Sequence, residues 1–258
     1  YDNITDILRS ISIVTFVAIG VTFSLIVGGF DLSVGSTVSL TTVVSASMMV
    51  WYEQGAVATL VIPIVLSLLV GFINSFLVVK IRIPDLLATL AMLYIVNGIH
   101  MTYSKGYSIY ANMPMADGTT APGKFQQWFL WLGQGEIMSV PVPVILTFLL
   151  VVITHIYLTY TRQGRMLYMT GGNLEAARLS GIPVDRYRTL AYVLSALFAG
   201  LGGMLLAARI GTGQVSSGGS MLMDAVAAAF VGFSVFGAGK PNVFGTFVGA
   251  ILIGVLLN

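Results

Sequence analysis

The chain has 258 residues, of which 57% are hydrophobic and only 9% are charged, and its formal net charge is +2. A soluble domain carries about 25% charged residues, because its outer shell needs polar side chains. The composition therefore excludes a soluble enzyme, a disordered chain and a nucleic-acid binder. It predicts an all-α, polytopic transmembrane bundle. The absence of cysteine excludes disulfides and thiolate metal sites, and we expect no metal site.

Eight apolar segments have lengths suited to membrane spans. In chain order they are Ile11–Gly28, Val34–Tyr52, Ala56–Val79, Leu86–Ser104, Val142–Tyr160, Leu190–Arg209, Asp224–Ala238 and Asn242–Asn258. The seventh is short and contains two glycines, so we expect a broken or re-entrant helix there. The chain opens with Tyr1 and closes on an apolar run, so both ends look cut and we expect further spans.

Lysine and arginine are distributed unevenly between the two sides of this predicted bundle. If the spans alternate, one side carries eight of the twelve basic residues, namely Lys80, Arg82, Arg162, Arg165, Arg178, Arg186, Arg188 and Lys240. The opposite side carries all three tryptophans, as expected for an interfacial aromatic belt. The positive-inside rule makes the basic side cytoplasmic. Residues 161–189 then form a cytoplasmic segment, and residues 105–141 form an external cap.

The cytoplasmic stretch at 171–183, Gly-Gly-Asn-Leu-Glu-Ala-Ala-Arg-Leu-Ser-Gly-Ile-Pro, has the pattern of a short capped helix. Asn173 is a good N-cap, Glu175 lies at the positive end of the helix, and Arg178 lies toward the negative end. Gly181 stops the helix. Two helical turns are not stable alone in water, so the flanking spans or a partner must hold them. The residues by themselves fit a surface turn and a docking element equally.

Three stretches of the sequence resemble the permease subunits of ABC importers, in particular the ribose-type sugar permeases of the branched-chain-permease superfamily. They are 29–36 (GFDLSVGS), 171–183, and 222–228 (LMDAVAA) followed by 237–240 (GAGK). The resemblance runs from about Asn3 to Asn258. It implies one transmembrane permease domain over residues 1–258, with a cytoplasmic coupling segment at 161–189.

The resemblance also implies partners and a function. A separate ATP-binding cassette ATPase, which carries the ATP and Mg, would grip the coupling segment, whereas this chain holds no cofactor. A second permease copy or a paralogue would complete the pathway, and a solute-binding protein would deliver a pentose, hexose or related furanosyl compound at 105–141. The setting would be the bilayer of the bacterial cytoplasmic membrane, and the mechanism alternating access. The implied coupling residues are Gly172, Asn173, Glu175, Ala176, Ala177, Arg178, Leu179, Ser180 and Gly181.

A shift of 210 residues aligns 23–38 with 233–248, with five of the sixteen positions identical. Paired glycine-interrupted segments in the two halves of a transporter point to its pathway. With alternating spans both copies run in the same direction, which fits a parallel repeat or a miscounted span. The candidates for the pathway or its gate are Phe23, Gly29, Asp31, Ser33, Asn74, Asn97, Asp224, Phe233 and Gly239.

Four of these candidates have two readings each. Asp31 and Asp224 each follow a break and precede an apolar run, so each is either a helix N-cap or a polar anchor near the gate. Asn74 and Asn97 lie inside spans, where an amide either bonds another helix or lines the pore.

The chain is not expected to be an enzyme. The stretch 237–241 hints at a P-loop, but Ser234 and Pro241 stand where that motif needs Gly and Ser or Thr. Two other classes remain open: an ion- or proton-coupled secondary transporter, which needs acids or histidines in mid-span, and a non-transporting scaffold. Among ABC permeases, the solute could also be a branched-chain amino acid or a nucleoside.

Overall fold

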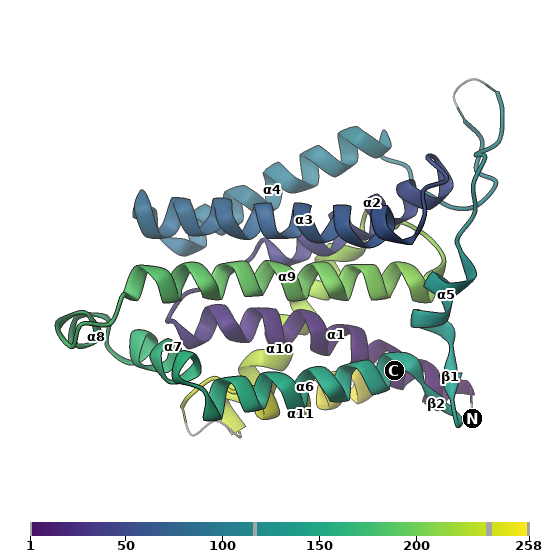
Figure 1. Cartoon of the computed structure of the whole chain (residues 1–258). Helices are drawn as coiled ribbons and strands as arrows, with labels where there is room; N and C mark the ends of the chain where they lie inside the picture. Colours follow the sequence, from purple (N-terminus) through teal and green to yellow (C-terminus); the bar gives the residue numbers. More distant parts are fainter. Residues whose placement is uncertain (1, 116–117, 236–238, 257–258) are drawn as a thin grey trace.

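The computed structural model describes residues 2–115, 118–235 and 239–256, and it is almost entirely helical (Figure 1). Six helices are long and apolar enough to cross a membrane, and two shorter helices, α2 and α11, are also apolar. The chain is a multi-pass membrane protein. The elements are α1 (Asp2–Ile26), α2 (Val34–Val50), α3 (Ala56–Ser75) with a π-helical turn (Phe76–Lys80), α4 (Asp85–Ser104), α5 (Gln127–Gln134), β1 (Glu136–Ile137), β2 (Val140–Pro141), α6 (Val142–Tyr160), α7 (Arg162–Gly172), α8 (Leu174–Leu179), α9 (Val184–Ile210), α10 (Ser217–Val235) and α11 (Val243–Leu256).

The long helices α1, α3, α6 and α9 run roughly parallel, and the short elements gather at the two ends of the bundle (Figure 1). Helices α7 and α8 lie at one end, which we call the basic end because most of the lysines and arginines fall there. Helix α5 and the hairpin β1–β2 lie at the opposite end, which we call the cap end. Helix α9 packs against α1, α2 and α3 and forms the centre of the bundle with them.

Helix α2 is buried along almost its whole length, although it carries many hydroxyl side chains. A buried hydroxyl is tolerated when it is hydrogen-bonded, and those of α2 donate mostly to carbonyls one turn earlier. Thr37 and Ser36, for example, both donate to the Ser33 carbonyl at 2.9 Å. Small, internally satisfied side chains of this kind let neighbouring helices approach closely, so α2 can be surrounded on all sides.

Helix α10 begins inside the bundle. The chain before it runs along α2: Thr42 donates to the Gln214 carbonyl at 3.0 Å, and the Gly218 amide donates to Ser39 Oγ at 2.9 Å. A Cβ atom on Gly218 would overlap the carbonyl oxygen of Gly35, so only glycine permits this approach. From that point α10 continues without a break to Val235, at the basic end.

These contacts correct two predictions for the seventh segment. The helix starts at Ser217 rather than at Asp224, so Asp224 lies in the second turn of a helix and is not its N-cap. Gly232 does not interrupt α10; it packs directly against the backbone of Gly245 in α11. The predicted end at Ala238 and the second glycine, Gly237, lie outside the described residues. Helix α10 is continuous over 19 residues and is long and apolar enough to cross a membrane, so the expectation of a broken helix is wrong.

The other boundaries differ mainly where polar residues extend a helix beyond its apolar run. Helix α1 begins at Asp2, ahead of the predicted Ile11, and α9 begins at Val184 rather than Leu190. In α1 the added turns contain an ion pair between Asp6 and Arg9 at 3.6 Å. In α9 the start is set by Pro183, which stands before the first turn.

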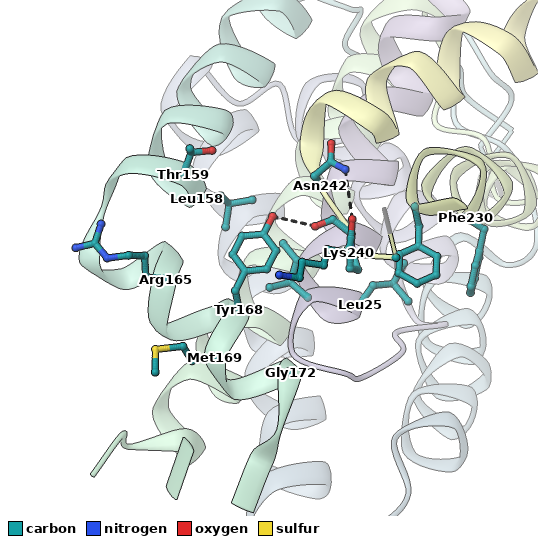
Figure 2. A pocket seen from close by; sticks show the side chains of 15 residues that line it. Leu25, Leu158, Thr159, Arg165, Tyr168, Met169, Gly172, Phe230, Lys240 and Asn242 are labelled. Atoms are coloured by element: carbon teal, nitrogen blue, oxygen red, sulfur yellow. Dashed lines mark hydrogen bonds between the residues drawn. The ribbon is translucent and has the colours of Figure 1, made fainter. Parts of the chain in front are cut away.

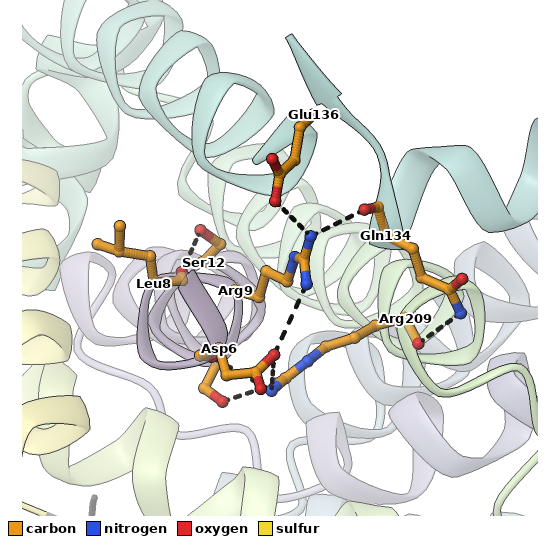
Figure 3. Close-up of polar contacts among 8 residues, drawn as sticks. Asp6, Leu8, Arg9, Ser12, Gln134, Glu136 and Arg209 are labelled. Atoms are coloured by element: carbon orange, nitrogen blue, oxygen red, sulfur yellow. Dashed lines mark hydrogen bonds and ion pairs between the residues drawn. The ribbon is translucent and has the colours of Figure 1, made fainter. Parts of the chain in front are cut away.

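A polar network joins the four elements α1, α5, β1 and α9 at the cap end (Figure 3). Arg9 of α1 donates to the Gln134 carbonyl at 2.8 Å and to Glu136 Oε1 at 3.0 Å. Arg209, near the end of α9, donates to Ser10 Oγ at 2.6 Å and to the Asp6 carbonyl at 3.2 Å. The two arginines therefore fix the cap-end elements to α1 and α9.

Candidate functional site

Helix α8 has the capped geometry that the sequence predicted. The Asn173 side chain accepts a hydrogen bond from the Ala176 amide at 3.0 Å. Glu175 and Arg178 form an exposed ion pair at 3.8 Å, and Arg178 also lies 3.9 Å from Asp185. Gly181 has a φ of +78°, which ends the helix. Exposed ion pairs of this kind add little stability, and both charged side chains remain accessible on the surface of α8.

The sides of α8 are unequally accessible. Ala177 is buried against Ile182 and Val184, so it holds the turn together and cannot touch a partner. Leu179, by contrast, is 87% exposed. This large apolar side chain at the tip of α8 is therefore accessible to another protein. Of the implied coupling residues only Ala177 is buried, and the largest accessible side chains are those of Glu175, Arg178 and Leu179.

Helix α7 contacts the break between α1 and α2. A Cβ atom on Gly171 would overlap the carbonyl oxygen of Ile26 and would lie 2.9 Å from the Val27 Cα. The backbones of the two segments therefore touch. Gly172, the next residue, has open space around it, with no atom within 4 Å of a Cβ built there. The close contact explains one glycine of the pair but not the other.

Helix α7 also contacts the turn between α10 and α11. The Tyr168 hydroxyl donates to the Pro241 carbonyl at 2.9 Å, and Figure 2 shows this bond across the cavity at the basic end. Burial raises the pKa of Tyr168 to about 12, so the hydroxyl remains a donor at physiological pH. The same short helix thus touches both the α1–α2 break and the α10–α11 turn, which we call the two interruptions of the bundle.

A cavity of about 950 Å³ lies between α7 and the two interruptions (Figure 2). Its apolar wall includes Leu25, Leu158 and Phe230, and its polar groups include Lys240 and Asn242. Because the wall combines the end of α1, the turn after α10 and α7, any movement of α7 changes the shape of this space.

The α1–α2 break encloses a buried carboxylate. Asp31 is fully buried. Among the described residues no lysine or arginine pairs with it, and hydroxyl and amide groups donate to it instead. Ser33 donates through its backbone N–H at 2.9 Å and its hydroxyl at 2.7 Å, Ser195 of α9 donates at 2.8 Å, and Asn74 of α3 lies 3.5 Å away. We call Asp31, Ser33, Asn74 and Ser195 the Asp31 cluster. Hydrogen bonding of this kind is what makes a buried charge tolerable.

The Asp31 cluster decides between the readings of two predicted residues. Ser33, not Asp31, stands immediately before α2, so the N-cap reading of Asp31 is wrong; the carboxylate instead ties the break to two other helices. Asn74 donates to Ser33 Oγ at 2.7 Å, which fits the reading as a bond between helices.

The remaining backbone of the break is held from α4 and α9. The Phe30 amide donates to Asp85 at 2.7 Å, and Thr89 donates to the Phe30 carbonyl at 3.2 Å. Gly29 lies against Tyr192, whose hydroxyl would be 2.5 Å from a Cβ at that position. A side chain at 29 would displace the Tyr192 hydroxyl, so close packing favours glycine at this position.

The other pathway candidates lie apart from the Asp31 cluster. Phe23 is buried and stacks on Phe198 with ring centroids 5.5 Å apart. Asn97 Oδ1 accepts a hydrogen bond from His100 Nε2 on the same helix at 2.9 Å. Phe233 and Gly239 line the cavity, and Asp224 lies on α10. Their roles in transport stay predictions.

Sequence reasoning missed Ser195, Asp85 and Tyr168. Asp85 had a usable signal, since it follows Pro84 at the start of a helix, where an acid is favoured. Ser195 had none, because a single serine in an apolar run is ordinary, and its partner is 164 residues away.

A helical bundle interrupted at two places at the same end has the architecture of a membrane transporter. The family described as "Branched-chain amino acid transport system / permease component" matches residues 3–258. The ribose import permease protein RbsC of Haemophilus influenzae is 34% identical over 259 residues, which cover 100% of this chain and 76% of that protein. That of Bacillus subtilis is 33% identical, covering 99% and 76%. The xylose transport system permease protein XylH of Escherichia coli is 28% identical, covering 99% and 77%. No solved structure matches.

The chain belongs to this family of permease components. The match extends over almost the whole sequence, so the helical bundle, both interruptions and the α7–α8 segment are all parts of the permease.

Replacing Tyr168 with Phe removes the hydrogen bond to Pro241 and is expected to cost about 0.5–1.5 kcal/mol of stability. This corresponds to a fall in Tm of about 1–6 °C, measured by thermal unfolding in detergent. Because the folded-state pKa is raised, the contribution is fully present below about pH 10 and is lost as the pH rises through about 12. The matched control is Tyr157→Phe, which removes a hydroxyl bonded to Gln163 at 2.7 Å, away from both interruptions. An unchanged Tm for Tyr168→Phe would show that the bond does not hold α7 to the turn.

Proposed function

We propose that this chain is the membrane-spanning subunit of an ATP-driven sugar importer, translocating a pentose, hexose or related furanosyl compound by alternating access. The family and the names of the ribose and xylose permeases support this proposal. ATP and Mg bind to a separate ATPase subunit. The basic end faces the cytoplasm of a bacterium, and a solute-binding protein delivers the sugar at the cap end.

The observation that carries the proposal is the position of α7 and α8. Helix α8 projects a charged and apolar tip, and α7 touches both interruptions of the bundle through Gly171 and Tyr168. A force applied to the tip is transmitted to the α1–α2 break and to the α10–α11 turn. This is the connection that an importer driven from outside its membrane subunit needs.

In the proposed cycle, closure of the ATPase on nucleotide moves α8. The Asp31 cluster keeps the α1–α2 break attached to α3 and α9. Movement of α7 shifts the opposite side of the break, so α1 and α2, which meet at the break, change tilt. The cavity between α7 and the interruptions opens or closes with this movement. A second permease copy or a paralogue supplies the opposite wall of the pathway. No covalent chemistry takes place on this subunit.

Leu179→Asp is expected to release the ATPase and to lower ATP-dependent uptake. Burying a leucine contributes about 1.5–3 kcal/mol, which is roughly a ten- to hundredfold change in affinity. The measurement is the amount of ATPase that co-purifies in mild detergent. The matched control is Met138→Asp, since Met138 is 95% exposed but lies at the cap end; it should keep the ATPase. Full retention of the ATPase by Leu179→Asp would place the docking site elsewhere.

The identity of the solute needs a separate comparison, because the family description names branched-chain amino acids and the relatives are named for sugars. Uptake of labelled pentoses, hexoses and branched-chain amino acids by cells that express the complete transporter separates these classes. Uptake of an amino acid without a sugar would overturn the sugar assignment and leave the ATP-driven mechanism standing.

A further inference from the structure

The exposed surfaces of the spanning helices differ in polarity. On α3 every exposed side chain is apolar, and the polar Thr59, Ser67 and Asn74 are all buried. On α11 the exposed side chains are apolar as well. Such faces suit contact with lipid hydrocarbon.

Helix α10 breaks this pattern with an accessible polar stripe along one side. Its polar members are Ser220, Asp224 and Ser234, with Ser216 immediately before the helix; Gly219 and Ala227 lie between them, and the exposed Met223 and Phe230 share this face. Their spacing of three and four residues places them on one face of the helix. All are exposed or partly exposed. We call this set the α10 stripe.

Asp224 makes it unfavourable for the α10 stripe to face lipid. Its carboxylate has no hydrogen bond or ion pair with any residue in the ranges that the structure describes. Charged groups at membrane depth face a water-filled cavity or a protein partner. The Asp31 carboxylate shows the contrast, since four donors surround it at or within 3.5 Å.

The stripe also leads to a defined place. Phe230, beside it on α10, lies 5.9 Å from Phe30 of the α1–α2 break, and Phe230 and Phe233 line the basic-end cavity. The stripe therefore runs from within the bundle, beside α2, to the space between α7 and the two interruptions. One chain supplies only one side of this route.

We propose that the α10 stripe is a wall of the translocation pathway, that it faces the same stripe of a second copy across water, and that Asp224 accepts hydrogen bonds from the hydroxyls of the passing solute. Two carboxylates related by symmetry repel each other, so water must separate them at this level. Hydroxyls and carboxylates are acceptors that a sugar can meet and leave without a tight pocket, which conduction requires. This proposal rests on the proposed function for the nature of the solute.

The chain contains no cysteine, so single cysteines report accessibility without a background. Ser216→Cys, Ser220→Cys and Ser234→Cys are placed in the complete transporter in membrane vesicles and treated with a charged, membrane-impermeant methanethiosulfonate. The matched controls are Val65→Cys on α3 and Ile251→Cys on α11, both exposed on apolar faces. The stripe cysteines should react at least about tenfold faster than the controls, because the thiolate forms in water, and labelling should block uptake.

A second measurement tests Asp224 itself. Asp224→Asn should raise the KM for uptake several-fold at normal abundance, because a carboxylate accepts stronger hydrogen bonds than an amide. Stripe cysteines that react as slowly as the controls would overturn the pathway proposal, even if sugar uptake is intact. Rapid labelling in a transporter that imports no sugar would overturn the proposed solute and keep the pathway.

Discussion

Asp31→Ala is expected to abolish uptake and to reduce sharply the amount of folded protein in the membrane. The substitution leaves the Ser33 amide, the Ser33 hydroxyl and the Ser195 hydroxyl buried without their acceptor. Each unpaired buried donor costs about 1–3 kcal/mol, and the three belong to the α1–α2 break and to α9. The measurement is abundance after membrane extraction, followed by Tm in detergent and by uptake.

Two variants separate the loss of the Asp31 hydrogen bonds from a general destabilisation caused by removing any acidic residue within the membrane. Asp31→Asn keeps an oxygen acceptor for Ser33 and should lie between wild type and Asp31→Ala in Tm. Asp224→Ala removes the second intramembrane carboxylate, which has no hydrogen bond or ion pair to lose within the described part of the chain, so its Tm should stay close to wild type. Equal losses of Tm for Asp31→Ala and Asp224→Ala would contradict the structural role of the Asp31 cluster.

Gly171→Leu is expected to stop transport while the ATPase remains bound. Any side chain at 171 would overlap the Ile26 carbonyl, so α7 must move away from the α1–α2 break. Helix α8 and its exposed tip are unaffected, since Leu179 is eight residues further along the chain. The variant should hydrolyse ATP without import, measured as ATPase activity and uptake in the same proteoliposomes.

Gly172→Leu is the control for this variant, because a Cβ at 172 meets no atom within 4 Å. The two variants add the same side chain to neighbouring glycines of one helix end, and they differ only in whether the backbone of the break lies behind it. Equal loss of uptake in both would mean that the helix end itself, rather than its contact with the break, is sensitive.

The sequence predicted the helices well where the cause of each is local. Each of the eight apolar runs corresponds to a helix in the described residues, six of them long enough to cross a membrane and two shorter. The Asn173 cap and the stop at Gly181 were confirmed because each depends on residues a few positions apart. The Asp31 cluster depends instead on Ser195 and Asn74, 164 and 43 positions away. No periodicity connects such residues, and the polar side chains involved are individually ordinary.

The prediction for the start of α10 was wrong for a related reason. Its first turn, Ser-Gly-Gly-Ser at 217–220, has the composition of a linker and a low intrinsic preference for helix. It is helical because Gly218 fits against Gly35 and bonds Ser39 of the buried α2. Tertiary packing overrides local preference here, and the same glycines that weaken the prediction make the packing possible.

The contact of α7 with both interruptions restricts the conformations that the bundle can adopt. If the α1–α2 break and the α10–α11 turn moved independently as two hinges, one in each half of the bundle, they would allow four combinations of positions. In two of these combinations only one half has moved. Hinges joined through one short helix favour the two combinations in which both halves have moved or neither has. The contacts of α7 with the break and the turn, together with the ring contact between Phe30 and Phe230, therefore favour joint movement of the two halves of the bundle.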